Sequence, residues 1–154
     1  MARRRSYKAP PSEQARAGDR KFAAMWSSLV TSPAFHDLSD HQARLYLCCV
    51  LETRGRASDD PDGGELYFYM NRHLYVEHYG IYGKGNEGGF RRDMAALIEH
   101  GFVDCARNGH ATHNKSLYRL SSRWQLWGEK GFSMPESFMT EHMLNERAKK
   151  LESW

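Results

Sequence analysis

The chain has 154 residues, 40% of them hydrophobic and 12% aromatic, and a formal net charge of +3. This length suits one domain with an adequate core plus tails, and the composition excludes wholesale disorder. No apolar run reaches the length of about eighteen residues that a membrane span needs, and the first residues, "MARRRSYKAPP", lack the apolar middle of a secretory signal, so we expect a cytoplasmic protein.

Positive charge is concentrated at the N-terminus. Residues 1–22 carry a net charge of +5, whereas the remainder carries −2. Residues 1–20 are polar, rich in alanine, proline and arginine, and without apolar periodicity, so we predict a disordered basic arm that contains Arg3, Arg4 and Arg5. Because the rest of the chain is not basic, the net charge alone does not establish a nucleic-acid partner.

Two helices are predicted after the arm. Apolar residues recur with helical spacing over residues 22–30, and this first helix should end before Ser32-Pro33. The second helix opens with the capping box Ser39-x-x-Gln42 and closes at Gly55. Its spacing predicts an inward face made of Ala43, Tyr46, Leu47, Val50 and Leu51.

A loop, a short strand and a short helix should follow. The stretch "RASDDPDGGE" (residues 56–65) has the composition of a loop, and "LYFYM" (residues 66–70) is a β-prone run suited to an edge strand. Asn71 can cap a short helix that Gly80 ends, with Leu74 and Tyr79 facing inward.

The next helix carries an arginine pair and follows the flexible stretch Gly83–Gly89. One apolar face is made by Phe90, Met94, Leu97 and Ile98. Gly101 supplies the left-handed residue that commonly follows a helix, so that Phe102 can fold back onto Leu97. Arg91 lies on the flank, and the face opposite the core should hold Gly88, Arg92, Ala95, Ala96 and Glu99. A small exposed face with one or two long cations is typical of a helix that enters a DNA groove, and also of many ordinary surface helices.

The last predicted elements are a hairpin and a C-terminal helix. Residues 102–120 indicate two strands around a turn, with Asn108-Gly109 as a favourable hairpin dipeptide. Trp124 and Trp127 are predicted apolar anchors behind it. Residues 135–153 predict a helix with a broad apolar surface, which either packs on its own domain or forms a two-fold homodimer.

The predicted order is helix, helix, short strand, short helix, loop, helix, strand, turn, strand. This order indicates a mainly α, α+β fold, a winged helix-turn-helix with a small β-hairpin wing beside its second helix. The expected organisation is a basic arm over residues 1–20, a winged-helix domain over 21–128 and a C-terminal helical segment over 129–154.

Residues 21–128 also resemble a known family. The resemblance rests on the motifs "HLYVEHYGIYGKGNEGGFRRDMAALIEHGFVD" and, after the wing, "NKSLYRLSSRWQLWG". They are similar to the winged-helix DNA-binding proteins of bacterial plasmids, phages and integrative elements, including the N-terminal domains of some replication initiators. One departure is the connection Gly80–Gly89, which is longer than the tight turn of the standard motif and leaves open how rigidly the second helix is held.

The resemblance implies a sequence-specific binder of double-stranded DNA that acts as a regulator, or as a replication or transfer accessory protein, of a mobile element. It implies no enzymatic activity and no cofactor. The candidate DNA-binding residues lie on the second helix and the loop before it, on the wing and on the arm: Lys84, Asn86, Arg91, Arg92, Arg107, His110, His113, Lys115, Arg3, Arg4 and Arg5.

The alternatives to DNA binding are a protein-binding module, a metal site and a nuclease or strand-transfer enzyme. A winged helix can bind protein without DNA specificity, and the charge of the chain outside the arm suits that alternative. A metal site is disfavoured because His110-x-x-His113 with Cys105 is the only local cluster, and the odd, partly adjacent cysteines imply no disulfide framework. Cys48 and Cys49 are interpreted as packing residues. A nuclease or strand-transfer enzyme needs preorganised carboxylates or a nucleophile, whereas the acids here cluster in the loop 56–65.

Overall fold

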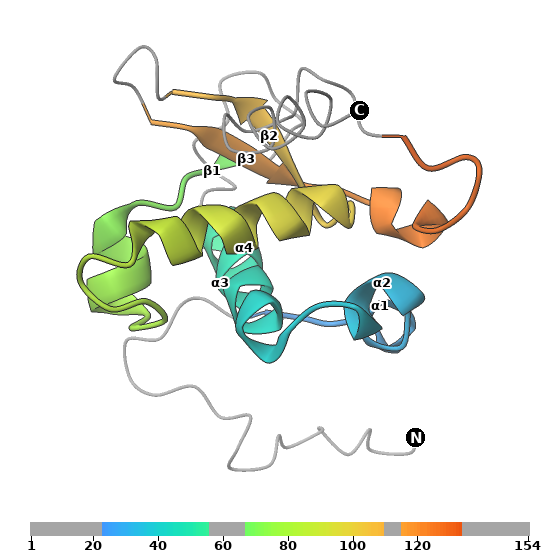
Figure 1. Cartoon of the computed structure of the whole chain (residues 1–154), viewed down its shortest axis with the longest axis horizontal. Coiled ribbons are helices and arrows are strands. Elements are labelled where there is room, and N and C mark those ends of the chain that lie inside the picture. The colour runs from blue at the N-terminus through green and yellow to red at the C-terminus, as the bar shows by residue number, and fades with distance from the viewer. Residues whose placement is uncertain (1–22, 56–66, 110–114, 134–154) are drawn as a thin grey trace, which may run out of the picture.

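The computed structural model describes residues 23–55, 67–109 and 115–133. It is an α+β fold in which helices pack on a small antiparallel sheet (Figure 1). The helical elements are α1 (Ser27–Val30), α2 (Pro33–His36), α3 (Asp40–Gly55), the π-helical turn η2 (His73–His78), α4 (Glu87–Glu99) and the 3₁₀ turn η3 (Arg123–Leu126). The strands are β1 (Tyr67–Phe68), β2 (Val103–Arg107) and β3 (Leu117–Leu120). Within this part of the chain, no helix is both long and apolar enough to cross a membrane.

Several predictions concern residues outside the described ranges. They are the basic arm with Arg3, Arg4 and Arg5, the loop 56–65, the wing residues His110 and His113, and the C-terminal helix 135–153.

The predicted first helix is wrong in extent. Only α1 forms within it; Trp26 precedes that turn and is 78% exposed, so the apolar periodicity of residues 22–30 does not mark one buried face. The chain then starts a separate turn, α2, because the Ser32 hydroxyl accepts a hydrogen bond from the Phe35 amide at 3.2 Å and Pro33 suits a first helical position.

Helix α3 begins as predicted. The Ser39 hydroxyl accepts from the Gln42 amide at 3.2 Å, and the Gln42 side chain accepts from the Ser39 amide at 3.0 Å, which is a complete capping box. Its buried face differs from the prediction, since Leu47 is 38% exposed whereas Leu45 and Cys49 are fully buried. The reason is that α3 contacts α4 on one side and β1 and β3 on another, so burial extends over more than one stripe.

Helix α4 ends as predicted. Phe90, Met94, Leu97 and Ile98 are all buried. Gly101 has a φ of +82°, and the Phe102 amide donates to the Leu97 carbonyl at 2.9 Å, which is a Schellman cap. Ala95 is buried rather than exposed, a correction to the predicted outer face, because α4 packs against both α3 and β2.

The sheet has the order β1-β3-β2, and both strand pairs are antiparallel. β1 lies at an edge, as predicted, and β2 and β3 form the predicted hairpin. The dipeptide Asn108-Gly109 does not form a two-residue turn, because Arg107 pairs with Leu117 and the connection therefore covers residues 108–116. A bulge between Cys105 and Arg107 accompanies this longer connection.

Phe102 joins the helices at the centre of the core. Its ring is fully buried and lies 5.1 Å from the ring of Tyr46, 6.1 Å from that of Phe35 and 6.1 Å from that of Trp124, measured between ring centroids. Trp127 is half-buried and stacks on the His100 ring at 5.0 Å. The prediction that Trp124 and Trp127 anchor the chain after the hairpin is confirmed.

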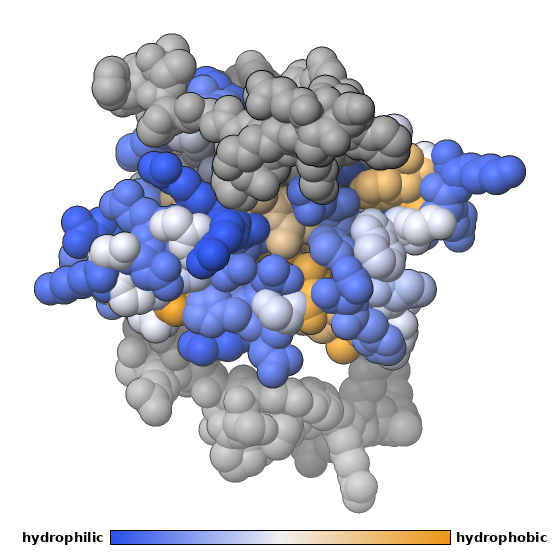
Figure 2. Space-filling model, viewed as in Figure 1, coloured by the Kyte–Doolittle hydropathy of each residue, from blue (hydrophilic) through white to orange (hydrophobic). Residues whose placement is uncertain are grey.

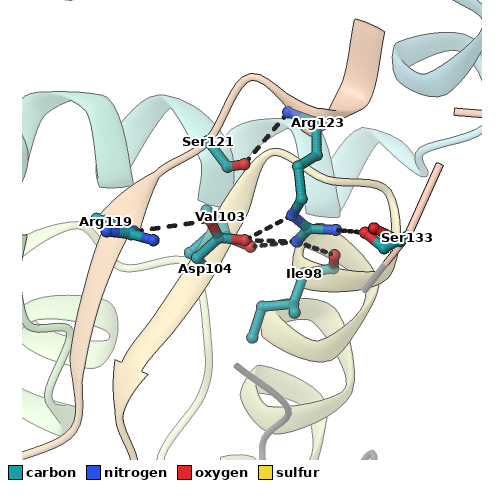
Figure 3. Close-up of polar contacts among 7 residues, drawn as sticks. All are labelled: Ile98, Val103, Asp104, Arg119, Ser121, Arg123 and Ser133. Carbon is teal, nitrogen blue, oxygen red and sulfur yellow. Dashed lines mark hydrogen bonds and ion pairs between the residues drawn. The ribbon is translucent and has the colours of Figure 1, made fainter. Parts of the chain in front are cut away.

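A buried ion pair ties β2 to η3 (Figure 3). The Arg123 Nε donates to the Asp104 carboxylate at 2.8 Å, and the same guanidinium donates to the Ile98 carbonyl at 3.0 Å. Arg119 approaches the other carboxylate oxygen at 3.7 Å. Because Ile98 lies in the last turn of α4, one guanidinium joins the end of that helix, a strand of the sheet and η3.

Three tyrosines have raised pKa values, from which we expect a loss of stability at alkaline pH. Burial, followed by the charge of Cys49, raises the pKa of Tyr46 to about 12, and burial followed by a hydrogen bond to a carboxylate raises the pKa of Tyr79 and Tyr82. The folded protein therefore keeps protons that the unfolded chain releases, so this contribution is fully present below the unfolded pKa of about 10 and is lost above it. The buried Tyr46 and Tyr82 should each remove about 1.4 kcal/mol of unfolding free energy per pH unit above 10, until they ionise in the folded state. The half-buried Tyr79 should remove less, because solvent screens its charge. Urea denaturation at a series of pH values measures this loss, and Tyr79→Phe should reduce its slope.

Candidate nucleic-acid interface

The N-terminal end of α4 and the end of the β2–β3 hairpin at which Arg107 pairs with Leu117 lie on the same side of the molecule (Figure 1). α4 runs toward this side from its C-terminal contact with β2, and the hairpin extends in the same direction above it. The surface over η2 and the start of α4 is mostly hydrophilic in the view of Figure 2. An exposed helix end and a strand pair therefore share one polar side of the fold.

The two arginines of α4 differ in their surroundings. Arg91 and Arg92 are both exposed. Arg91 lies 4.0 Å from the Glu87 carboxylate one turn earlier, an exposed contact that contributes little to stability. Arg92 makes no ion pair within the described part of the chain, so its guanidinium is available to a ligand.

Arg91 also lies near the sheet. The pKa of Tyr118 in β3 is raised mainly by burial, and the charge of Arg91 is among the effects that oppose the rise. Burial and then Glu87 raise the pKa of Tyr75 in η2, and Arg72 and Arg91 oppose that rise. The charge of Arg91 therefore reaches a tyrosine in η2 and another in β3, whereas sequence spacing placed Arg91 only on the flank of its own helix.

Arg72 is a cation of this surface that sequence reasoning missed. It is exposed at the start of η2 and its charge reaches the Tyr75 phenol, as that of Arg91 does. The available signal was its position directly after the cap Asn71, whose side chain accepts from the Leu74 amide at 3.0 Å. The sequence predicts that cap, but it does not indicate that Arg72 lies within electrostatic reach of the same tyrosine as Arg91 of α4.

Lys84 and Asn86 have different roles. Lys84 is exposed in the connection before α4. Asn86 is the N-cap of α4, and its side-chain oxygen accepts from the Gly89 amide at 3.2 Å. The helix thus starts at Glu87 and takes in Gly89, the last residue of the stretch Gly83–Gly89 that was predicted to be flexible. A β-carbon at Gly89 would lie 2.6 Å from the Asn86 side-chain oxygen, so a larger residue there would require the Asn86 side chain to shift.

The connection before α4 is packed rather than loose. Ile81 and Tyr82 are buried, and their amides donate to the Tyr75 carbonyl at 2.9 and 3.1 Å. The Tyr75 ring stacks on Phe90 with 4.1 Å between centroids, which links η2 to the first turn of α4. The length of the connection therefore does not leave α4 unsupported.

The cations of the hairpin stem make contacts of their own. The Arg107 guanidinium donates to the Lys115 carbonyl at 3.1 Å, and the Lys115 ammonium lies 4.1 Å from the centre of the Tyr69 ring. Both residues are exposed, so their charges still face solvent. His110 and His113 lie outside the described residues.

Over residues 23–55, 67–109 and 115–133, the other side chains to consider are the cysteines and the possible metal ligands. No three side chains of His, Cys, Asp or Glu in these ranges are grouped closely enough to hold a metal ion. Burial raises the pKa of the Cys48 and Cys105 thiols to about 11, so they remain protonated packing residues at neutral pH. Comparisons with protein-family models, with curated proteins and with solved structures gave no match to this chain.

Proposed function

We propose that this chain is a winged-helix protein that binds double-stranded DNA sequence-specifically, with α4 as the recognition helix and the β2–β3 hairpin as the wing. The order of the elements supports this assignment. A helix, α3, and the turn η2 precede α4, and the hairpin follows it directly and packs on it. A recognition helix of a helix-turn-helix protein reads the major groove through residues near its N-terminus.

The observation that carries the proposal is that Arg92, near the N-terminal end of α4, is exposed and makes no ion pair within the described residues. It lies in the second turn of this helix. An arginine so placed can make the bidentate contact to guanine O6 and N7 that is the commonest specific contact in the major groove. Other exposed cations, which would contact phosphates and so set position and affinity, are Arg91, Arg72, Lys84 and Lys115.

The resemblance in sequence extends the proposal to a biological role. We infer a regulator, or a replication or transfer accessory protein, of a bacterial mobile element.

Replacement of Arg92 tests the proposal. Duplexes are first selected from a random pool with the full chain, and dissociation constants are then measured for the selected duplex and a scrambled one. Arg92→Ala should weaken binding to the selected duplex by about 1–3 kcal/mol, because one arginine–guanine contact is lost. Arg91→Ala should weaken it less, since that guanidinium is shared with Glu87.

Lys130, an exposed cation after η3, provides the control. Lys130→Ala removes the same charge outside the proposed interface and should leave both constants nearly unchanged. Wild-type affinity should also fall with salt, with a slope of about 0.9 per phosphate contact. An absence of salt-dependent duplex affinity would contradict the proposal and favour a protein-binding module; unchanged binding by Arg92→Ala would show that another element reads the DNA.

A further inference from the structure

Asp93, the residue after Arg92 in α4, links this helix to the connection before it and to α3. Its carboxylate accepts a hydrogen bond from the Tyr82 hydroxyl at 2.7 Å and a longer one from the Gln42 side-chain amide at 3.4 Å. Tyr82 belongs to the connection before α4, and Gln42 lies in the first turn of α3. One half-buried carboxylate therefore holds α4, the connection and α3 together.

The partners of Asp93 are themselves fixed. Gln42 uses its side-chain oxygen in the capping box of α3, which leaves its amide group to reach Asp93. Tyr82 is 4% exposed, and its ring lies 4.7 Å from the His41 ring and 5.9 Å from the Phe90 ring. Because Gln42 and Tyr82 are held by these other contacts, they cannot move with α4 if that helix is displaced. Their hydrogen bonds to Asp93 therefore favour one position of α4.

We propose that Asp93 is a positioning residue, which sets the placement of α4 against α3 and so directs the neighbouring Arg92 toward its base. This inference rests on the proposed function of α4. Arg92 and Asp93 are adjacent on one helix turn, so a rotation or tilt of α4 moves the tip of the long arginine side chain much more than it moves the helix axis. A bidentate contact tolerates little displacement, whereas phosphate contacts by flexible cations tolerate more.

The charge of Asp93 and its hydrogen bonds can be separated by substitution. Asp93→Asn removes the negative charge but keeps an oxygen that can accept from Tyr82, whereas Asp93→Ala removes both. Tyr82→Phe keeps the charge and removes the main donor. Glu99→Gln removes one negative charge from the exposed far end of α4 and serves as the charge control.

The first measurement is the ratio of affinities for the selected and the scrambled duplex, at a temperature where every variant is folded. Asp93→Ala and Tyr82→Phe should lower this ratio about tenfold, within the range for loss of one arginine–base contact. Asp93→Asn and Glu99→Gln should bind both duplexes somewhat more tightly and keep the ratio. A purely structural role would lower the melting temperature without changing the ratio, and that result, or an unchanged ratio in Tyr82→Phe, overturns the proposal.

The second measurement does not depend on DNA. Amide hydrogen exchange of the full chain should increase in residues 83–92 of Asp93→Ala and much less in Asp93→Asn, with β2 and β3 unchanged. If the wild-type chain selects no duplex, the proposed function fails, and exchange still decides whether Asp93 positions α4. If a duplex is selected but exchange is equal in the two variants, the positioning role alone is refuted.

Discussion

Asp104→Ala is expected to lower the unfolding free energy by about 3–5 kcal/mol, the usual cost of removing one partner from a buried ion pair. The Asp104 side chain is 8% exposed and that of Arg123 is 19% exposed, so water cannot readily replace the lost carboxylate. The substitution leaves the Arg123 guanidinium without its main counter-ion, although that group still donates to the Ile98 carbonyl. Arg119 loses the same partner at 3.7 Å.

Urea denaturation followed by tryptophan fluorescence measures this effect, since Trp124 adjoins Arg123 in η3. The double variant Asp104→Leu with Arg123→Met is the matched control, because replacing both charges with apolar groups avoids an unpaired buried ion. It should recover part of the loss but not all of it, because the Ile98 and Ser133 carbonyls lose a donor. A loss below about 1 kcal/mol in Asp104→Ala would show that solvent screens the pair as it screens exposed ones.

The parts of the fold that sequence predicted are those that depend on near neighbours. The capping box of Ser39 and Gln42 involves residues three apart, and the Schellman cap at Gly101 involves residues within one turn. Both therefore follow from local residue types. The edge position of β1 was also predicted, from the short β-prone run of residues 66–70, although the strand itself spans only Tyr67–Phe68.

The failures have tertiary causes. The apolar spacing of residues 22–30 is helical, yet Trp26 is exposed because no other described element covers that face. Asn108-Gly109 is a favourable turn dipeptide, but pairing of Arg107 with Leu117 decides the length of the connection. In the first case a covering element is missing among the described residues, and in the second a strand pairing outweighs a local preference; spacing along the chain reveals neither.

The candidate interface was predictable only as a set of exposed cations. Sequence placed Arg91 and Arg92 outside the apolar face of α4, and both are exposed. It could not show that Glu87 engages Arg91, that the charges of Arg72 and Arg91 reach the same phenol, or that Asp93 reaches Gln42 across 51 residues of chain. Such contacts depend on how α3, η2 and α4 cross, which no single element determines.

Gly101→Ala should destabilise the protein by about 2–5 kcal/mol, because two separate penalties add at this position. The residue has a φ of +82°, a left-handed conformation that costs an L-residue with a side chain about 1–2 kcal/mol. A β-carbon would also lie 2.5 Å from the Trp124 amide nitrogen and 2.7 Å from the Arg123 carbonyl carbon, which are backbone atoms that cannot rotate away. Forcing them apart is an overpacking strain of about 1–3 kcal/mol.

Gly128→Ala separates the two penalties. Gly128 has a φ of +84°, but a β-carbon there would meet no atom within 4 Å, so only the conformational cost remains. The difference between the two variants in unfolding free energy therefore measures the collision with η3. That collision should also displace Trp124 from its stacking on Phe102, so the tryptophan emission of folded Gly101→Ala should differ from wild type while that of Gly128→Ala does not. Equal losses in the two variants would mean that η3 moves aside without cost, and the close contact of Gly101 with η3 would then contribute nothing to holding this turn against the core.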